Sequence, residues 1–285
     1  RDSNPGEIEI SAGGVTRNIC DNLARLGADV KFVSAVGDDL FAQLICEQSA
    51  QAGIDVSHIY HTPGRSSSMY LAILDNSGDM HVALSDMHVL QNLPLDYLER
   101  KRELIANAAV VVTDPCMKAE RFERVLSYCR PGQIVCVDPV STAYARALIP
   151  YIGQIHTVKP NRLELEILAG QPVDTDARLE SACETLLNRG VQRVFVSLGA
   201  EGCFYMDDTG AVLRRKLRPA KMVNASGAGD SFAAAMLYAT LQGYDAGKTL
   251  DYGMAAGIAA VTHERTINPN MSVPLLESIL QAYRP

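Results

Sequence analysis

The sequence lacks an excess of basic residues, and its formal net charge is −7. Nucleic acid and anionic membranes usually require a basic binding face, so we expect small molecules as partners instead. Its apolar runs, such as 109–112 and 233–237, are far shorter than the ~20 residues that span a bilayer, and no signal-peptide pattern opens the chain. These absences predict a cytosolic (cytoplasmic) protein that binds neither nucleic acid nor a membrane.

Common cofactor motifs are also missing. The seven cysteines are scattered without a CxxC motif, which argues against zinc or disulfide exchange and predicts reduced thiols in the core. No G-x-G-x-x-G stands between an opening strand and a helix, so a dinucleotide-dependent oxidoreductase is a poor fit. The 285 residues, 47% of them hydrophobic, are enough for one large domain, and no repeat or linker divides the chain.

Strand and helix patterns alternate along most of the chain, which is typical of α/β proteins. We predict strands over 30–36, 109–113, 134–138, 155–158, 194–198, 203–206 and 212–217. We predict helices after the Gly13-Gly14 turn and over 38–52, 93–107, 118–129, 229–241, 250–261 and 274–283.

The alternation breaks between residues 66 and 85. Two β-rich runs, 68–74 and 80–84, flank the turn-forming residues 75–79. No crossover helix is available there for a parallel strand, so the pattern predicts a hairpin in a small separate sheet. A sheet of this kind can act as a lid.

A run of small residues leads into the helix expected over 229–241. Gly227, Ala228 and Gly229 would let a ligand approach the backbone, and the free N–H groups and dipole of the helix start favour a phosphoryl group. Asp230 follows directly, where a carboxylate would suit the attacking hydroxyl and could accept its proton. Acidic residues are also favoured in a first helical turn on electrostatic grounds alone, and the local pattern leaves both roles open.

A second signal lies at a strand-to-helix junction. Asn161 and Glu164 are spaced to share one helix face, where an amide and a carboxylate could hold a hydrated Mg²⁺ against triphosphate oxygens. The same spacing fits an ordinary capping box, and the local pattern alone favours that interpretation.

Two glycine-rich segments give weaker signals. Gly13 and Gly14 again permit close approach to the backbone, and Asn18 offers an amide for vicinal hydroxyls. The turn 197–202 follows a predicted strand and could line a nucleotide pocket, although such turns are common.

Together and in this order, these segments resemble the ribokinase-like (PfkB) carbohydrate kinase family: an early Gly-Gly with Asn, a mid-chain Asn-x-x-Glu and a late Gly-Ala-Gly-Asp. The resemblance covers nearly the whole chain and favours catalytic roles over capping roles. It implies one domain, 1–285, with a three-layer α/β/α core and a mostly parallel sheet. It also implies a small β-sheet lid, with elements at about 6–12 and 66–86, that closes over the sugar and forms a homodimer.

The resemblance implies roles for individual residues. Asp230 is the catalytic base, and Gly227, Ala228 and Gly229 form the anion hole. Substrate binding falls to Gly13, Gly14, Asn18, Ser68 and Asp86, with Ser67 a further candidate for reading a base. ATP binding falls to Lys159, Asn161, Ser197, Gly199 and Gly202, and Mg²⁺ binding to Asn161 and Glu164 through water.

Two features depart from the family pattern. The opening strand that usually ends in a sugar-binding aspartate does not precede Gly13 in this sequence. Asn224 stands where many relatives have an aspartate that helps to bind a monovalent cation, which leaves dependence on K⁺ open.

Within the family, the sequence is most similar to bacterial pseudouridine kinases, on the segments 2–6, 13–19, 74–76, 137–141, 154–164 and 268–269. The implied reaction transfers the γ-phosphate of ATP to the 5′-hydroxyl of pseudouridine. Another sugar or nucleoside kinase of the family, such as a ribokinase or an inosine-guanosine kinase, is the main alternative. A non-catalytic nucleoside sensor on the same fold is a third, but it would need neither Asp230 nor Glu164.

Overall fold

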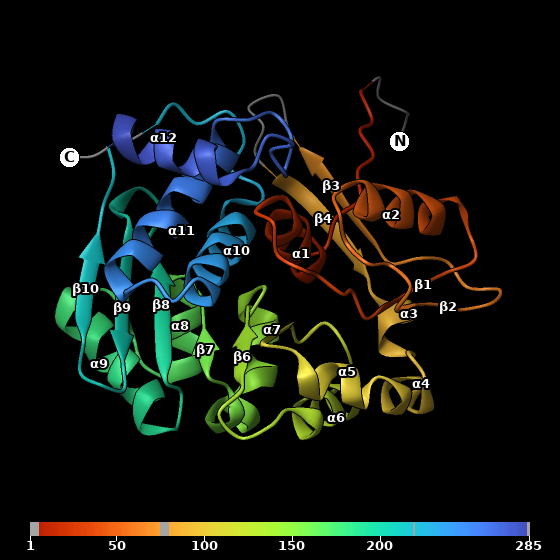
Figure 1. Cartoon of the computed structure of the whole chain (residues 1–285), viewed down its shortest axis with the longest axis horizontal. Coiled ribbons are helices and arrows are strands. Elements are labelled where there is room, and N and C mark those ends of the chain that lie inside the picture. The colour runs from red at the N-terminus through yellow and green to blue at the C-terminus, as the bar shows by residue number, and fades with distance from the viewer. Residues whose placement is uncertain (1–5, 75–79, 219, 284–285) are drawn as a thin grey trace.

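The computed structural model describes residues 6–74, 80–218 and 220–283. The centre of the protein is a six-stranded sheet with the strand order β10-β9-β8-β7-β6-β5 (Figure 1). Four neighbouring strands run parallel: β5 (Val110–Thr113), β6 (Ile134–Val137), β7 (Thr157–Val158) and β8 (Arg193–Ser197). The antiparallel strands β9 (Cys203–Asp207) and β10 (Val212–Arg215) extend one side. The predicted, mostly parallel sheet is confirmed.

The central sheet is buried on both faces because successive strand residues point to opposite sides. Val135 and Val137 of β6 belong to one core cluster, whereas Cys136 between them belongs to the other. The first cluster lies under α6 (Ala119–Tyr128), α7 (Thr142–Leu148), α8 (Arg162–Ala169) and α9 (Asp176–Asn188). The second lies under α1 (Val15–Arg25), α2 (Leu40–Gln51), α10 (Ala228–Leu241) and α11 (Ala246–Val261). The layers are therefore α/β/α.

Two small sheets accompany the amino-terminal part. β1 (Ser34–Val36) and β2 (Ile59–His61) pair in parallel. β3 (Met69–Leu74) and β4 (Met80–Asp86) form the predicted antiparallel pair, and the turn at 75–79 lies outside the described residues. Residues 6–12 contain no helix or strand, so their membership of a lid stays a prediction.

Several element bounds differ from the sequence prediction. The helix expected over 93–107 is two short helices, α4 (Leu95–Arg100) and α5 (Arg102–Asn107), and α3 (His88–Gln91) precedes them. Pro94 explains why α4 begins at Leu95, since it precedes that helix in an extended conformation and has no N–H to continue a helix, and Lys101 lies between α4 and α5. The strand expected over 30–36 keeps only its last three residues. α12 (Val273–Tyr283) packs beside α11, as Figure 1 shows, and 3₁₀ turns cover Ile149–Gln154 and Gly199–Glu201.

All seven cysteines are free thiols, as predicted. Burial raises the pKa of Cys20 and of Cys136 to about 12, which keeps both protonated and unreactive at neutral pH. Among the residues that the structure describes, no helix combines the length and the apolar character needed to cross a membrane.

Candidate active site

Polar residues follow three neighbouring parallel strands at the same edge of the sheet. Asp114 follows β5, Asp138 follows β6 and Lys159 follows β7. The carboxyl ends of parallel strands form the usual binding edge of an open α/β sheet. The candidate active site therefore lies where these strand ends meet the first turn of α10.

Asn18 and Asp230 come together across the packed helices α1 and α10, which lie next to each other in Figure 1. The Nδ2 of Asn18 donates a hydrogen bond of 2.8 Å to Oδ2 of Asp230, although the two residues are 212 positions apart. Asn18 is buried, and its Oδ1 has no hydrogen-bond partner among the described residues. The predicted sugar-binding amide and the predicted base thus share one location.

The environment of Asp230 makes its carboxylate unusually basic. Burial is the main cause that raises the pKa of Asp230 to about 7, and the negative charges of Asp138 and Asp114 add to it. The hydrogen bond from Asn18 and the charge of Lys159 oppose this rise. A carboxylate that titrates near neutral pH is suited to take a proton from a hydroxyl group.

Gly227 fixes the start of α10. It is the N-cap residue in the left-handed region, at φ 76°, and a Cβ built on it would lie 2.1 Å from the carbonyl oxygen of Thr266. Only glycine fits this position without a shift of the backbone. The first N–H groups of the helix, from Ala228 onward, have no intrahelical acceptor and are free for an anion, and the anion-hole role of 227–229 stays a prediction.

Lys159 and Asp138 form a buried ion pair beside this turn. Lys159 is 4% exposed and Asp138 is 6% exposed, and their Nζ and Oδ2 atoms are 3.1 Å apart. Burial by itself would lower the pKa of Lys159, but the negative charges of Asp138, Glu164 and Asp230 raise it, so the ammonium stays charged. The predicted ATP ligand Lys159 is therefore already paired with a carboxylate.

The segment after Asp138 has a strained backbone. Val140 lies at φ 67°, which is rare for a β-branched residue, and Ser141 N donates to Pro139 O at 2.7 Å across it. The Val140 N–H donates to Oδ1 of Asp138 at 2.8 Å. This bond and the Lys159 pair together fix the orientation of the Asp138 carboxylate.

Asn161 and Glu164 form a complete capping box at the start of α8. Asn161 Oδ1 accepts from Glu164 N, and Glu164 Oε2 accepts from Asn161 N, both at 2.9 Å. The capping interpretation is thus confirmed, and the Mg²⁺ role stays a prediction. Glu164 is 5% exposed; burial raises its pKa, and the Asn161 N–H opposes the rise. Its Oε1 has no hydrogen bond within the described chain, so the pair retains oxygen donors of the kind that Mg²⁺ prefers.

The remaining nucleotide candidates lie next to this box. Ser197 forms a β-bridge with Asn161, and the turn that contains Gly199 closes with a 2.9 Å bond from Leu198 N to Gly202 O. A Cβ on Gly202 would lie only 2.0 Å from Arg215 O. Packing against β10 is therefore sufficient to explain this glycine.

The predicted base-reading residues make other contacts in the structure, and their role stays a prediction. Asp86 is exposed at the end of β4 and bonds His88 through its N–H and its ring Nδ1. Ser67 is buried, and its hydroxyl donates to the Asp39 carboxylate. Within the described chain, no hydrogen bond joins Asp86, Ser67 or Ser68 to the Asp230 cluster. Gly14, in contrast, is the N-cap of α1 and accepts from Asn18 N at 2.7 Å, which places the Gly13-Gly14 turn beside the site.

Sequence reasoning missed Asp114 and Asp138. Thr16, in the first turn of α1, donates to Asp114 Oδ2 at 2.5 Å, and Asp138 holds Lys159. Each acid stands at or just after the end of a predicted strand, and that position could have marked both. The side-chain amide of Asn224 joins two segments of the chain: Nδ2 donates to Glu264 O, beyond α11, and Oδ1 accepts from Ser226 N.

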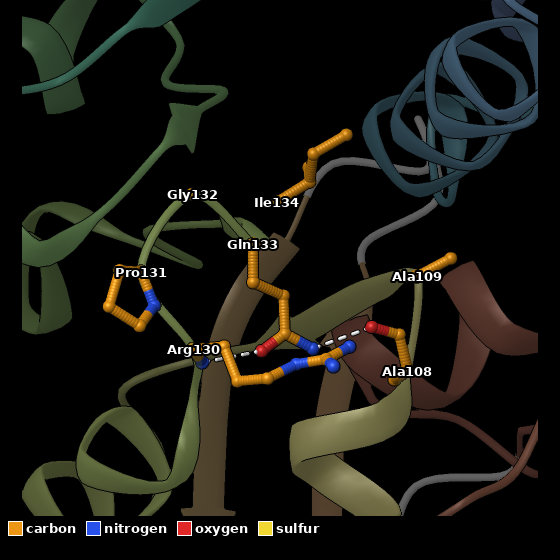
Figure 2. Close-up of a pocket in the computed structure, with 7 residues that line it drawn as sticks. All are labelled: Ala108, Ala109, Arg130, Pro131, Gly132, Gln133 and Ile134. Atoms are coloured by element: carbon orange, nitrogen blue, oxygen red, sulfur yellow. Dashed lines mark hydrogen bonds between the residues drawn. The ribbon is translucent and has the colours of Figure 1, made fainter.

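A cavity of about 430 Å³ lies elsewhere, at the amino ends of β5 and β6, and is lined by 108–109 and 130–134 (Figure 2). Gln133 donates there to the carbonyl oxygens of Ala108 and Ile105 and accepts from Arg130 N. The side-chain amide of Gln133 is thus fully engaged in tying two loops together. This cavity is at the opposite edge of the sheet from Asp230 and is not part of the candidate site.

Comparison with known families decides the class of the protein. A family model described as pfkB family carbohydrate kinase matches residues 1–273. The chain belongs to this family. It is therefore a sugar or nucleoside kinase, a phosphotransferase that acts on a hydroxyl group, as the motifs of the sequence indicated.

Individual relatives agree with this assignment. The chain is 33% identical to pseudouridine kinase of Escherichia coli (strain K12) over 280 residues, which cover 98% of this chain and 89% of the relative. Arabidopsis thaliana ribokinase complexed with ribose and ATP has a similar fold, with a TM-score of 0.85, 21% identity and coverage of 99% and 93%. An E. coli protein solved with ATP and Mg²⁺ gives a TM-score of 0.85 at 20% identity, with coverage of 98% and 92%.

Proposed function

We propose that this kinase transfers the γ-phosphoryl group of ATP to the 5′-hydroxyl of pseudouridine, with Asp230 as the base. The observation that carries the mechanism is the Asn18–Asp230 hydrogen bond at the amino end of α10. It places a sugar-binding amide, a carboxylate of raised pKa and free helix N–H groups in one location. The identity to E. coli pseudouridine kinase supports the choice of substrate.

The reaction follows from these positions. Asn18 holds Asp230 so that its carboxylate can accept the proton of the 5′-hydroxyl. The hydroxyl oxygen forms a bond to the γ-phosphorus while the bond from that phosphorus to the bridging oxygen breaks, and ADP leaves with the electron pair. The N–H groups at 228–230 stabilise the charge on the transferring group, which is the main requirement of phosphoryl transfer.

Asn161 and Glu164 are the residues that would hold Mg²⁺. The ion, when bound, neutralises charge on the phosphate oxygens of ATP. The buried Glu164 carboxylate, fixed by the backbone of Asn161, suits an ion that keeps part of its hydration shell. The ATP and Mg²⁺ named for the E. coli structure of the same fold are consistent with these assignments.

We further propose that β3 and β4 form a lid and a homodimer interface. Leu71 pairs with Leu84 and Ile73 with Val82, so these side chains share one face of the ribbon, and each is between 45% and 67% exposed. A two-stranded ribbon is only marginally stable by itself. Its exposed apolar face is best covered by the identical ribbon of a second copy of this chain. The other face includes Ser85, whose side chain hydrogen-bonds with Tyr144 of α7.

A substrate panel tests the proposed function. Purified protein is incubated with ATP, Mg²⁺ and either pseudouridine, uridine, inosine, ribose or fructose, and ADP release is followed in a coupled assay. We expect the highest kcat/KM with pseudouridine, and ³¹P NMR should identify a 5′-monophosphate. Higher kcat/KM with inosine or ribose would reassign the substrate within the family. Binding of nucleosides without ADP release from any of them would support the sensor alternative.

A further inference from the structure

The turn formed by residues 12–14 leads into α1 and has one buried residue. Ala12 is 7% exposed, whereas Gly13 and Gly14 are exposed. A Cβ built on Gly13 would meet no atom within 4 Å, so the space beside this glycine is open to a ligand. The turn is therefore anchored to the protein at Ala12 and open at the two glycines that are predicted to face the sugar.

Two side chains hold the backbone of Ala12. Oε1 of Gln48, on α2, accepts from Ala12 N at 3.2 Å, and Nη1 of Arg17, on α1, donates to Ala12 O at 3.4 Å. Within the described chain, no hydrogen bond between backbone groups joins residues 6–13 to the rest of the protein. The position of the turn therefore depends on these two side chains and not on a neighbouring strand or helix.

The Arg17 side chain is itself firmly held. It is 5% exposed, its Nη2 donates to Oδ2 of Asp21 at 2.7 Å, and its Nε donates to Oγ of Ser49 at 3.1 Å. A buried charge costs free energy unless its hydrogen bonds are made, and here the partners come from both α1 and α2. The planar fork of the guanidinium therefore fixes the carbonyl group of Ala12 relative to these two helices.

The same network reaches the other half of the candidate site. Oδ1 of Asp21 accepts from Nε of Arg25 at 2.5 Å, and Nη1 of Arg25 donates to Pro269 O at 2.8 Å. The loop that contains Pro269 packs against the start of α10, since a Cβ on Gly227 would lie 2.1 Å from Thr266 O. Ion pairs and hydrogen bonds therefore connect the turn before α1 with the loop that supports the start of α10.

We propose that Arg17 and Gln48 are positioning residues that hold the Gly13-Gly14 turn where the sugar of the substrate can bind between it and Asp230. The proposal rests on the proposed function, because it assumes that the sugar binds at this turn. Both side chains act through the backbone of Ala12 and not through contact with the substrate. A displacement of about 1 Å away from the reacting atoms can cost about 10²-fold in rate, so a turn without a backbone anchor needs such support.

The first test uses Gln48, which is only half-buried, so that its replacement is compatible with folding. Gln48→Met keeps the length of the side chain but removes the oxygen that accepts from Ala12 N. Gln51→Met is the matched control, because Gln51 is exposed at the end of the same helix. The readouts are kcat, the KM for pseudouridine and for ATP, the Kd for ATP by calorimetry, and thermal unfolding.

The second test removes the other hydrogen bond to the turn. Arg17→Met deletes the guanidinium, and Asp21 keeps Arg25 as its partner, so no buried carboxylate is left unpaired. Arg17→Lys retains the positive charge but not the planar fork, and it tests whether a conservative replacement restores the support.

We expect kcat/KM for pseudouridine to fall by about tenfold in Gln48→Met and by more in Arg17→Met, because a displaced sugar binds less well and meets the base less often. The KM and the Kd for ATP should stay within about twofold of the wild type, since the turn is assigned to the sugar. Arg17→Lys should lie between the wild type and Arg17→Met. Gln51→Met should match the wild type in every readout.

Other outcomes overturn the proposal. Folded variants that keep kcat/KM for pseudouridine within about twofold of the wild type would exclude the positioning role. Equal losses for pseudouridine and ATP would indicate general structural damage and would exclude it as well. If Arg17→Met does not fold, Gln48→Met decides alone. In these cases the wild type still turns over substrate, and the proposed function stands.

The choice of substrate is separable from this test. If ribose or inosine replaces pseudouridine as the preferred substrate, the same measurements are made with that compound, because the turn is assigned to the sugar and not to the base. A wild type that phosphorylates no compound of the panel would overturn the proposed function and this inference together.

Discussion

Replacement of Asp230 by asparagine should abolish turnover and stabilise the fold in a pH-dependent way. The pKa of this carboxyl is raised from its ordinary 3.8 to about 7 in the folded chain, chiefly by burial. The folded state therefore holds the proton more tightly than the unfolded chain does. Stability is lost as the pH rises from about 4 to 7, and the full penalty is present above pH 7.

The size of this penalty follows from the same values. Each tenfold difference in proton affinity is worth about 1.4 kcal/mol, so the difference between 3.8 and about 7 corresponds to at most about 4 kcal/mol at pH 8. Asp230 is partly exposed and its charge is screened by solvent, so we expect a penalty of about 2 kcal/mol at pH 8 and of less than about 1 kcal/mol at pH 5. Asparagine keeps the shape and can still accept the hydrogen bond from Asn18.

Urea unfolding of the wild type and Asp230→Asn at pH 8 and pH 5 measures the difference directly. At pH 8 the free energy of unfolding of the variant should be higher by about 2 kcal/mol, and its kcat should be lower by several orders of magnitude with nearly unchanged substrate binding. Asp29→Asn is the control, because the Asp29 side chain is 84% exposed. A stability gain that is equal at both pH values would refute the electrostatic reasoning, and full turnover would refute the catalytic role.

Two further predictions concern neighbouring features. Asn18→Ala removes a hydrogen bond that lowers the pKa of Asp230, so the acidic limb of the kcat–pH profile should move to higher pH; a limb that stays in place would exclude this coupling. Leu71→Lys on the lid should convert the proposed dimer into a monomer in sedimentation velocity, whereas Val212→Lys, at an exposed apolar position on β10, should not. A Leu71→Lys protein that remains dimeric would place the interface elsewhere.

The alternating pattern of the sequence predicted most of the central elements because strands and helices in this fold are short and bounded by glycine or proline. It failed where the chain departs from that rhythm, as in the single helix expected over 93–107, which is divided at Lys101. The helix over 176–188 and the short one over 142–148 were not identified either, although each begins at a serine or threonine cap.

The site was predicted only in part because its contacts are not local. The pattern around Asp230 could not separate a base from a favourable helix start, and the family resemblance was needed to favour the base. Asp114 and Asp138 each stand at a predicted strand end, but only the strand order β5-β6-β7 shows that these ends are neighbours, and no local pattern specifies that order. At Asn161, in contrast, the local sequence pattern correctly predicted the capping box, and this box is compatible with the proposed binding of Mg²⁺.

The capping box also determines when the Glu164 carboxylate becomes ordered. Its orientation is set as α8 forms, because the first turn of that helix and the side chain hold each other. A flexible glutamate would lose rotamer freedom each time a ligand arrived, whereas this one has lost it during folding. The proposed Mg²⁺ site is therefore ordered before the ion binds, and a variant that frays the first turn of α8 should lose affinity at this site before the protein unfolds.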